Sequence, residues 1–310
     1  MPALHEASRA RTSGELSPAR RRALAASLAL LVALLALASP WILAVLLSTP
    51  IRMAIGPPPA DLGATSVHLP AAAGPMAGWL ARGVRGGGAV LLLHGVHDDR
   101  RAMLGRARAL RAAGYTVLLV DAPAHGESAG ERITFGARES AGARAAIAYL
   151  RAVAPGERVG ALGVSMGGAS LLLGDAEPPA NQADAVVLEM VYPTIEEAVT
   201  DRLRLHLGPI GPRFAPLLLA QLSPRLGVRA QELRPVDRIR LLRVPLLSIV
   251  GAEDRHTTLA ESQRLFSAAP EPKSLWVVPK ARHEDLHALA QTEYERRMLE
   301  FFGRYLRPAS

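Results

Sequence analysis

The sequence predicts an α/β fold: a doubly wound, mostly parallel sheet with a helical cap insertion, preceded by one N-terminal transmembrane helix. Two observations lead to this prediction. From about residue 88 onward, short apolar runs alternate with segments of helical spacing, a pattern typical of βαβ units around a parallel sheet. Before them lies an apolar run without any charge, and it is long enough to cross a bilayer, which takes about 20 residues.

The composition provides a large core and excludes several kinds of site. Of the 310 residues, 49% are hydrophobic and none is cysteine. Disulfides, thiolate metal sites and a cysteine nucleophile are therefore excluded. The formal net charge is +8, but the arginines are scattered among acidic residues, and few aromatic residues lie between them. We expect a solvated surface or attraction to anionic lipid, and no nucleic-acid partner.

Residues 1–22 are interpreted as a basic tail, and residues 23–48 as a transmembrane helix that serves as an uncleaved signal anchor. No charged residue occurs in the second segment, whereas five arginines precede it and only Arg52 follows it closely. By the positive-inside rule, the N-terminus stays in the cytoplasm. We expect a single-pass protein of a bacterial inner membrane, with its domain facing the periplasm or the cell exterior. A cleaved signal peptide, cut before Ser39, is the alternative.

The next segment, residues 49–63, contains three consecutive prolines and is expected to form a semi-rigid linker. One domain should follow, from residue 64 to residue 310. It begins with two short strands, residues 66–69 and 76–81, which are joined by a Gly/Pro turn as in a hairpin.

Six continuous apolar runs then predict strands that are buried on both faces. They are residues 88–94, 115–121, 158–164, 185–190, 244–250 and 275–278. Helical spacing predicts helices at residues 100–113, 135–152 and 283–306. Residues 194–243 break the alternation with helical, basic sequence that includes the apolar piece Phe214–Leu222. Because this insertion follows a predicted parallel strand, we expect it to form a cap over the carboxyl ends of the strands.

One stretch joins a predicted strand to a helix through Gly163-Val164-Ser165-Met166-Gly167, which fits the pattern G-x-S-x-G. A serine at such a sharp turn needs neighbours without side chains, because otherwise the strand and the helix would collide. The helix N-terminus directs backbone N–H groups and a partial positive charge at the place where an oxyanion would form. Ser165 is therefore the candidate nucleophile, and Gly163 and Gly167 are the glycines that permit the turn.

A serine hydroxyl needs a base to take its proton and an acid to orient that base. In a parallel sheet, such groups lie just beyond the carboxyl ends of the strands. Asp254 follows one predicted strand and His283 follows the next, so they are the candidate acid and base. Glu253 remains an alternative acid, and His256 or His287 an alternative base. We expect these three to be surface polar residues near the site.

An oxyanion also needs two hydrogen-bond donors. We expect these to be the backbone N–H groups of Met166, which follows the nucleophile, and of Val96, in the loop after the first buried strand. His94 in the same loop is expected to be structural. The polar residues around His97 match no common zinc spacing, so we expect no metal ion and no other cofactor.

Five segments in this order resemble the α/β-hydrolase superfamily, and within it a bacterial branch of serine-aminopeptidase-like and esterase-like hydrolases. They are Leu91–Gly95, Asp121–Ser128, Gly163–Gly167, Gly251–Asp254 and His283. The resemblance extends over about residues 64–307. It implies the roles given above to the candidate nucleophile, acid, base and oxyanion donors, and a structural role for the loop at residues 121–128.

The expected function is hydrolysis of an ester, thioester or amide through an acyl-enzyme on Ser165, by an enzyme anchored in the membrane. The apolar piece Phe214–Leu222 in the cap suggests small-molecule or lipid-like acyl substrates. Two alternatives stay open. One is an acyltransferase that uses the same acyl-enzyme with another acceptor, and the other is a non-catalytic binding protein that kept the fold.

Overall fold

The computed structural model describes residues 17–174 and 183–307. The chain divides into two compact units, residues 1–43 and residues 44–310. Helix α1 (Pro18–Ser48) forms the described part of the first unit, and its last residues belong to the second.

Helix α1 begins before the predicted membrane segment because its N-terminus has a suitable cap. The side chain of Ser17 accepts a hydrogen bond from the Arg20 amide at 3.4 Å, and Pro18 occupies the first helical position, where no N–H group is needed. In the part of the chain that the structure describes, no helix combines the length and the apolar character needed to cross a membrane. The middle of the predicted membrane segment, residues 32–40, has its side chains outside that part.

The second unit is built around an eight-stranded sheet in the order β10-β9-β8-β7-β4-β5-β3-β2. Its strands are β2 (Ala64–Leu69), β3 (Met76–Ala81), β4 (Ala89–Leu93), β5 (Thr116–Val120), β7 (Val159–Val164), β8 (Ala185–Glu189), β9 (Leu246–Gly251) and β10 (Lys273–Val278). The strands from β10 to β5 in this order run parallel. β3 pairs antiparallel with both β5 and β2, so the predicted hairpin forms one edge. The predicted mostly parallel, doubly wound sheet is confirmed.

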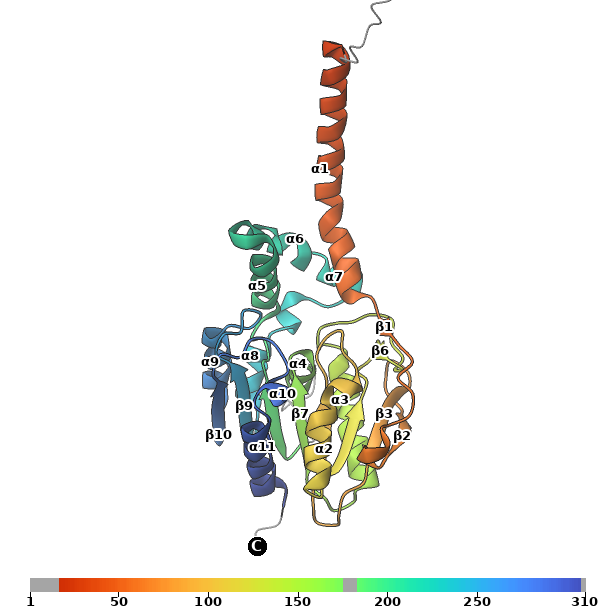
Figure 1. The fold of residues 1–310 in the computed structure, drawn as a ribbon, viewed down its shortest axis with the longest axis vertical. Coiled ribbons are helices and arrows are strands. Elements are labelled where there is room, and N and C mark those ends of the chain that lie inside the picture. The colour runs from red at the N-terminus through yellow and green to blue at the C-terminus, as the bar shows by residue number, and fades with distance from the viewer. Residues whose placement is uncertain (1–16, 175–182, 308–310) are drawn as a thin grey trace, which may run out of the picture. The chain divides into compact units, whose positions relative to one another are not determined.

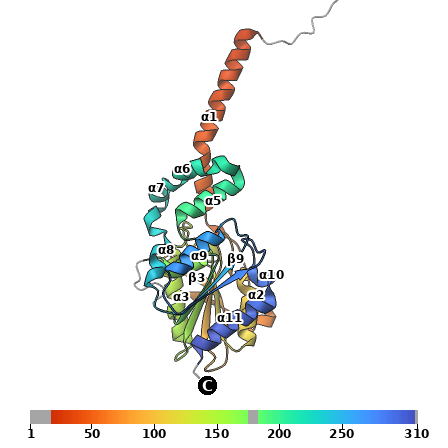
Figure 2. The same ribbon diagram turned by 90° about the vertical axis from the view of Figure 1, so that its left-hand side faces the viewer.

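Helices cover both faces of the sheet, because side chains along each strand alternate between the two faces. In β4, Leu91 packs in the core with α3 (Glu139–Val153), whereas Leu92 packs in the core with α2 (Leu104–Ala112) and α11 (Gln291–Leu306). Figure 2 shows α3 on one side of the sheet and α2 and α11 on the other. Burial on both faces explains why the strands read as continuous apolar runs.

Smaller features differ from the sequence-based expectation. The helix expected at residues 100–113 starts with a 3-10 turn, η2 (Arg100–Met103), and the one expected at 135–152 starts only at Glu139. A separate two-residue parallel ladder, not predicted, joins β1 (Ile51–Arg52) to β6 (His125–Gly126). The remaining elements outside the insertion are η1 (Ala60–Leu62), α4 (Met166–Leu172) and α9 (Leu259–Ala268).

The prediction of one helix at residues 283–306 is wrong in its first part. The chain instead forms a loop up to Asp285, then the short α10 (Leu286–Leu289), and then α11. Asp285 caps α10 by accepting hydrogen bonds from two amides of its first turn. Ala290, with φ −131° and ψ 42°, separates the two helices. His283 therefore lies in a loop, where its ring can be directed by neighbouring loops.

The insertion between β8 and β9 is helical, as predicted. It consists of α5 (Ile195–Leu207), η3 (Gly208–Phe214), α6 (Ala215–Leu219), α7 (Leu222–Leu226), η4 (Ala230–Glu232), α8 (Pro235–Arg238) and η5 (Ile239–Leu241). Gly208, with φ 66°, ends α5. Figures 1 and 2 show α5 and α6 beyond one end of the sheet, whereas α8 packs against α9. The first part of the insertion thus forms the cap, and the last part joins the core.

Candidate active site

Ser165 stands at the turn between β7 and α4, in a strained backbone conformation. Its φ of 51° and ψ of −113° lie outside the regions that non-glycine residues favour. Two hydrogen bonds hold it there. Its amide donates to the carbonyl oxygen of Glu189 at 2.8 Å, and its own carbonyl oxygen accepts from the amide of Ala169 at 2.9 Å. The turn is thus fixed from the neighbouring strand and from the helix that follows.

The two predicted glycines are required by close backbone contacts. A Cβ atom added to Gly163 would lie 2.5 Å from the carbonyl carbon of Gly167, and one added to Gly167 would lie 2.5 Å from the carbonyl oxygen of Leu93. Both distances are too short for non-bonded atoms. Gly168 is restricted in the same way, because its Cβ would lie 2.3 Å from a side-chain carbon of Val191.

Asp254 and His283 form a hydrogen-bonded pair in the loops after β9 and β10. Oδ2 of Asp254 lies 2.7 Å from Nδ1 of His283, while Oδ1 accepts hydrogen bonds from the amides of His256 and Thr257 at 2.7 and 3.0 Å. The two amides therefore hold the buried carboxylate through Oδ1, and its Oδ2 binds the ring of His283. This bond places the proton on Nδ1 and leaves the lone pair on Nε2, as a general base requires.

Ser165 lines two cavities. The first, which we call the polar cavity, has a volume of about 520 Å³ and is also lined by His283, Val96 and His256. The candidate nucleophile and the candidate base thus face one cavity, although they lie far apart in the sequence. Because histidines and acidic residues are among those that line this cavity, it suits the proton-transferring part of a reaction.

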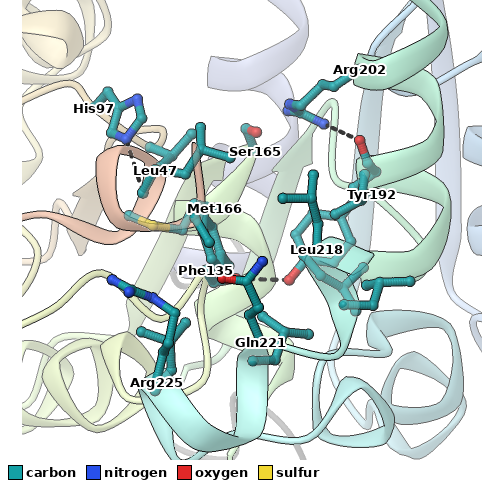
Figure 3. A pocket seen from close by; sticks show the side chains of 18 residues that line it. Leu47, His97, Phe135, Ser165, Met166, Tyr192, Arg202, Leu218, Gln221 and Arg225 are labelled. Carbon is teal, nitrogen blue, oxygen red and sulfur yellow. Dashed lines mark hydrogen bonds between the residues drawn. The ribbon is translucent and has the colours of Figure 1, made fainter. Parts of the chain in front are cut away.

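The second, apolar cavity has a volume of about 150 Å³. Its walls come from Phe135, from Leu218 and Leu222 of the cap, and from Leu47 near the end of α1 (Figure 3). The apolar cap piece predicted from the sequence does contribute to this wall. The part played by Leu47 was missed, because nothing distinguishes it from the other apolar residues of its run.

The loop after β4 passes beside Ser165. A Cβ added to Gly95 would lie 3.7 Å from the Ser165 Cβ, and Val96 lines both cavities. Met166 is the first residue of α4, so its N–H has no acceptor within the helix. The two expected oxyanion donors are thus placed next to the candidate nucleophile.

His94 is fully buried in this loop. Its Nδ1 lies 2.7 Å from the carbonyl oxygen of Gly95, and its Nε2 accepts a hydrogen bond from the Ala122 amide at 2.9 Å. Burial, followed by the charge of His125, lowers the pKa of His94 to about 3. A neutral ring with both nitrogens engaged fits the structural role expected for it.

The three alternative residues have different surroundings. Glu253 is exposed, as expected. His287 is not a surface residue. It is 5% exposed, and its Nε2 lies 2.9 Å from Oε1 of Glu295, because α10 turns this ring toward α11. His256 is half-buried and stacks on the ring of His283.

A buried ionic cluster below the site was not predicted. Arg106 in α2 binds the carboxylate of Glu189 at 2.7 Å, and the hydroxyl of Tyr294 donates to the same carboxylate at 2.6 Å. Arg106 also pairs with Asp285, at 3.0 Å, in the loop that carries His283. Since the Glu189 carbonyl holds the Ser165 amide, this cluster connects the candidate nucleophile to the loop of the candidate base.

Comparison with known proteins identifies the family. A model of the family described as serine aminopeptidase, S33, matches residues 86–233. The esterase Pf2001 of Pyrococcus furiosus has a similar fold, with a TM-score of 0.70 at 22% identity over 84% of this chain and 98% of that chain. The uncharacterized protein Rv2307c of Mycobacterium tuberculosis is 30% identical over 217 residues, 68% of this chain and 68% of that protein. The chain belongs to the α/β-hydrolase superfamily.

This α/β-hydrolase is also similar to the uncharacterized protein YqkD of Bacillus subtilis, with 24% identity over 213 residues, 68% of this chain and 70% of that protein. Family and fold together support a serine-hydrolase type of function.

Proposed function

We propose that this α/β-hydrolase is a membrane-anchored serine hydrolase that cleaves an ester, thioester or amide through an acyl-enzyme on Ser165. One observation supports this proposal above all. His283 is oriented by Asp254 through a 2.7 Å hydrogen bond and lines the same cavity as the strained Ser165. An oriented base beside a serine on a strand-to-helix turn is the arrangement that nucleophilic catalysis requires.

In the proposed reaction, Nε2 of His283 takes the proton of the Ser165 hydroxyl while Oγ attacks the carbonyl carbon of the substrate. The negative charge that develops on the carbonyl oxygen is stabilised by the backbone N–H groups of Val96 and Met166. The tetrahedral intermediate collapses, and His283 gives its proton to the leaving group. Water then attacks the acyl-enzyme by the same steps, which releases the acid and restores the serine.

The apolar cavity supports an acyl group as the part of the substrate that remains on the serine. An apolar cavity of about 150 Å³ holds a guest of the size of benzene, which corresponds to an acyl chain of roughly four to six carbons. The solved relative of similar fold is described as an esterase, so esters are the first class to test.

We further propose that residues 23–48 anchor the enzyme in a bacterial inner membrane, with the domain outside the cytoplasm. The charge-free run and the five arginines before it support this topology. Residues 49–63, which follow this run and pair with the domain through β1, would then keep the site close to the membrane surface, within reach of lipid-like substrates.

The test is labelling with a fluorophosphonate, which reacts with activated serines. Full-length protein should be labelled and Ser165→Ala protein should not. The purified protein should also hydrolyse p-nitrophenyl esters, with the highest kcat/KM at short acyl chains. Absence of labelling in folded protein would favour the non-catalytic alternative. Acyl transfer to an added alcohol at the expense of hydrolysis would favour the acyltransferase.

A further inference from the structure

Arg202 in α5 stands where the polar and the apolar cavity meet. Four residues line both cavities: Val96, His97, Ser165 and Arg202. Of these, Arg202 carries a permanent positive charge, and it is the lining residue that the cap contributes to the polar cavity. Figure 3 shows its side chain reaching from α5 toward Ser165. A substrate bound at Ser165 must therefore lie close to a guanidinium group.

Among the described residues, this guanidinium has no carboxylate partner. Its one hydrogen bond there goes to the carbonyl oxygen of Ala198, in its own helix, at 3.0 Å. The neighbouring Arg204, by contrast, forms an ion pair with Asp201 at 2.7 Å. A guanidinium group has five N–H donors, so most of those of Arg202 are available to a ligand.

Acidic residues that do not contact Arg202 directly also stabilise its positive charge only in part. Burial lowers the pKa of Arg202, and the negative charges of Asp254, Asp201 and Glu261 offset this effect only in part. A cation that is withdrawn from water without a close anion is less stable than a paired one. An anion that enters the site would supply the missing partner.

The acidic residues that line the polar cavity do not come from the cap. Asp98, Glu284 and Asp285 lie in the loops after β4 and β10, and Glu189 is the last residue of β8. Asp285 is already paired with Arg106 at 3.0 Å, and Glu284 accepts a hydrogen bond from the Arg282 amide at 2.9 Å. Arg106 also lines this cavity, but it is paired with Glu189 and Asp285. Within the described part of the chain, the cap thus contributes to the polar cavity a cation without a carboxylate partner and no acidic residue.

We infer that Arg202 binds an anionic group, a carboxylate or a phosphate, on the leaving group of the substrate while the acyl chain occupies the apolar cavity. This inference rests on the proposed function. His283 must protonate the leaving group, so the leaving group extends into the polar cavity that both residues line. A guanidinium group forms two parallel hydrogen bonds with a carboxylate or a phosphate, and these are strong where water is excluded.

The test uses two esters with the same acyl chain, 4-carboxyphenyl butyrate and its methyl ester, which lacks the negative charge. Full-length protein in detergent should have the higher kcat/KM for the anionic ester. Arg202→Gln should lower kcat/KM for the anionic ester roughly 10- to 100-fold more than for the methyl ester, mainly through KM. Arg202→Lys should keep part of the preference. A second pair, 4-phosphonophenyl butyrate and its diethyl ester, shows which anion depends more on Arg202.

Arg213 provides the matched control, because it is an exposed arginine of the same cap that lines neither cavity. Arg213→Gln removes the same charge and should leave the ratio between the two esters as it is in the wild type. Equal losses for both esters in Arg202→Gln, or the same change of ratio in Arg213→Gln, would overturn the inference.

A binding measurement separates this inference from the proposed function. In Ser165→Ala protein, 4-butyramidobenzoate should bind more tightly than its methyl ester by calorimetry, and adding Arg202→Gln should remove the difference. If this preference is present while the folded wild type hydrolyses no ester and is not labelled by the fluorophosphonate, the proposed function fails and the anion site stands. If esters are hydrolysed and neither assay shows the preference, the anion site is wrong and the proposed function stands.

Discussion

The rings of His256 and His283 lie face to face, with centroids 5.0 Å apart and planes inclined by 13°. Burial lowers the pKa of His256 to about 4, with further contributions from the charges of Arg202 and His283. His256 is therefore uncharged at neutral pH and does not repel the imidazolium that forms on His283. Asp254 fixes one edge of the His283 ring and His256 fixes its face, so His256 acts as a positioning residue.

His256→Ala should lower kcat with little change in KM, because the ring of His283 loses the surface that holds it. Misplacement of a catalytic group costs roughly 10- to 100-fold. His256→Phe keeps a flat ring and should recover most of this loss. Steady-state kinetics of both variants on one p-nitrophenyl ester will check this. A phenylalanine variant as slow as the alanine variant would show that packing is not the role of this ring.

Ser165→Ala should abolish hydrolysis and leave the fold intact, because the hydroxyl contributes chemistry and little packing. Loss of the nucleophile in such triads lowers kcat on the order of a million-fold. Turnover of the purified variant and its thermal unfolding will test both parts. Residual activity above a few per cent in protein free of wild type would show that another residue is the nucleophile.

Asp254→Asn should cost far more activity than Glu253→Gln. Asn can hold the ring of His283 but favours the wrong tautomer, which costs about 10⁴-fold in a comparable triad. Glu253 is exposed and serves as the matched control. Comparing kcat/KM of the two variants decides between them, and a larger loss at Glu253 would reassign the acid.

Acid should destabilise the fold through His94. Its pKa is about 3 in the folded chain and 6.5 as the reference value, so the unfolded chain binds a proton between these values that the folded chain does not. The contribution of His94 to the free energy of unfolding is therefore fully present above this window and is lost as the pH falls through it.

His94→Gln keeps a donor and an acceptor but cannot take up this proton. Between about pH 7 and pH 5, the free energy of unfolding of the variant should fall less steeply with decreasing pH than that of the wild type. The difference between the two slopes should correspond to the uptake of up to one proton on unfolding. Urea denaturation at several pH values will measure it. Identical slopes for the variant and the wild type would show that other groups cause the acid sensitivity.

An alkaline phosphatase fusion after residue 60 should be active, and a green fluorescent protein fusion at the same position should be dark. The reason is the basic flank before residues 23–48, which resists translocation and keeps the N-terminus inside. The opposite pattern would place the domain in the cytoplasm. A shortened protein that begins near residue 40 would instead reveal a cleaved signal peptide.

Some parts of the fold and of the site could be predicted because they depend on short stretches of sequence. The strands are recognisable because burial on both faces requires continuous apolar runs, and Ser165 because a strand-to-helix turn requires Gly163 and Gly167. Asp254 and His283 could be proposed because loops after neighbouring parallel strands meet at one edge of the sheet.

Other features depend on contacts between distant segments and leave no local pattern. Arg106, Glu189 and Tyr294 lie in different elements, and only the packing of α2 and α11 on the same face brings them together. Arg202 is one arginine among many in a basic, helical segment, so its position at the junction of the two cavities was also invisible. The break at Ala290 belongs to the same class, because it follows from the capping of α10 rather than from apolar spacing.

Leu47 contributes one wall of the apolar cavity, and its carbonyl oxygen accepts a hydrogen bond from Nε2 of His97 at 3.2 Å. The same residue belongs to the segment expected to hold the protein in the membrane. A shortened protein that begins after Ser48 lacks this wall of the cavity and would therefore accept larger acyl groups than the full chain. Acyl-chain preferences measured on the shortened protein would therefore differ from those of the full chain. Under the proposed topology, a substitution at Leu47 would change both the membrane segment and the wall of the apolar cavity.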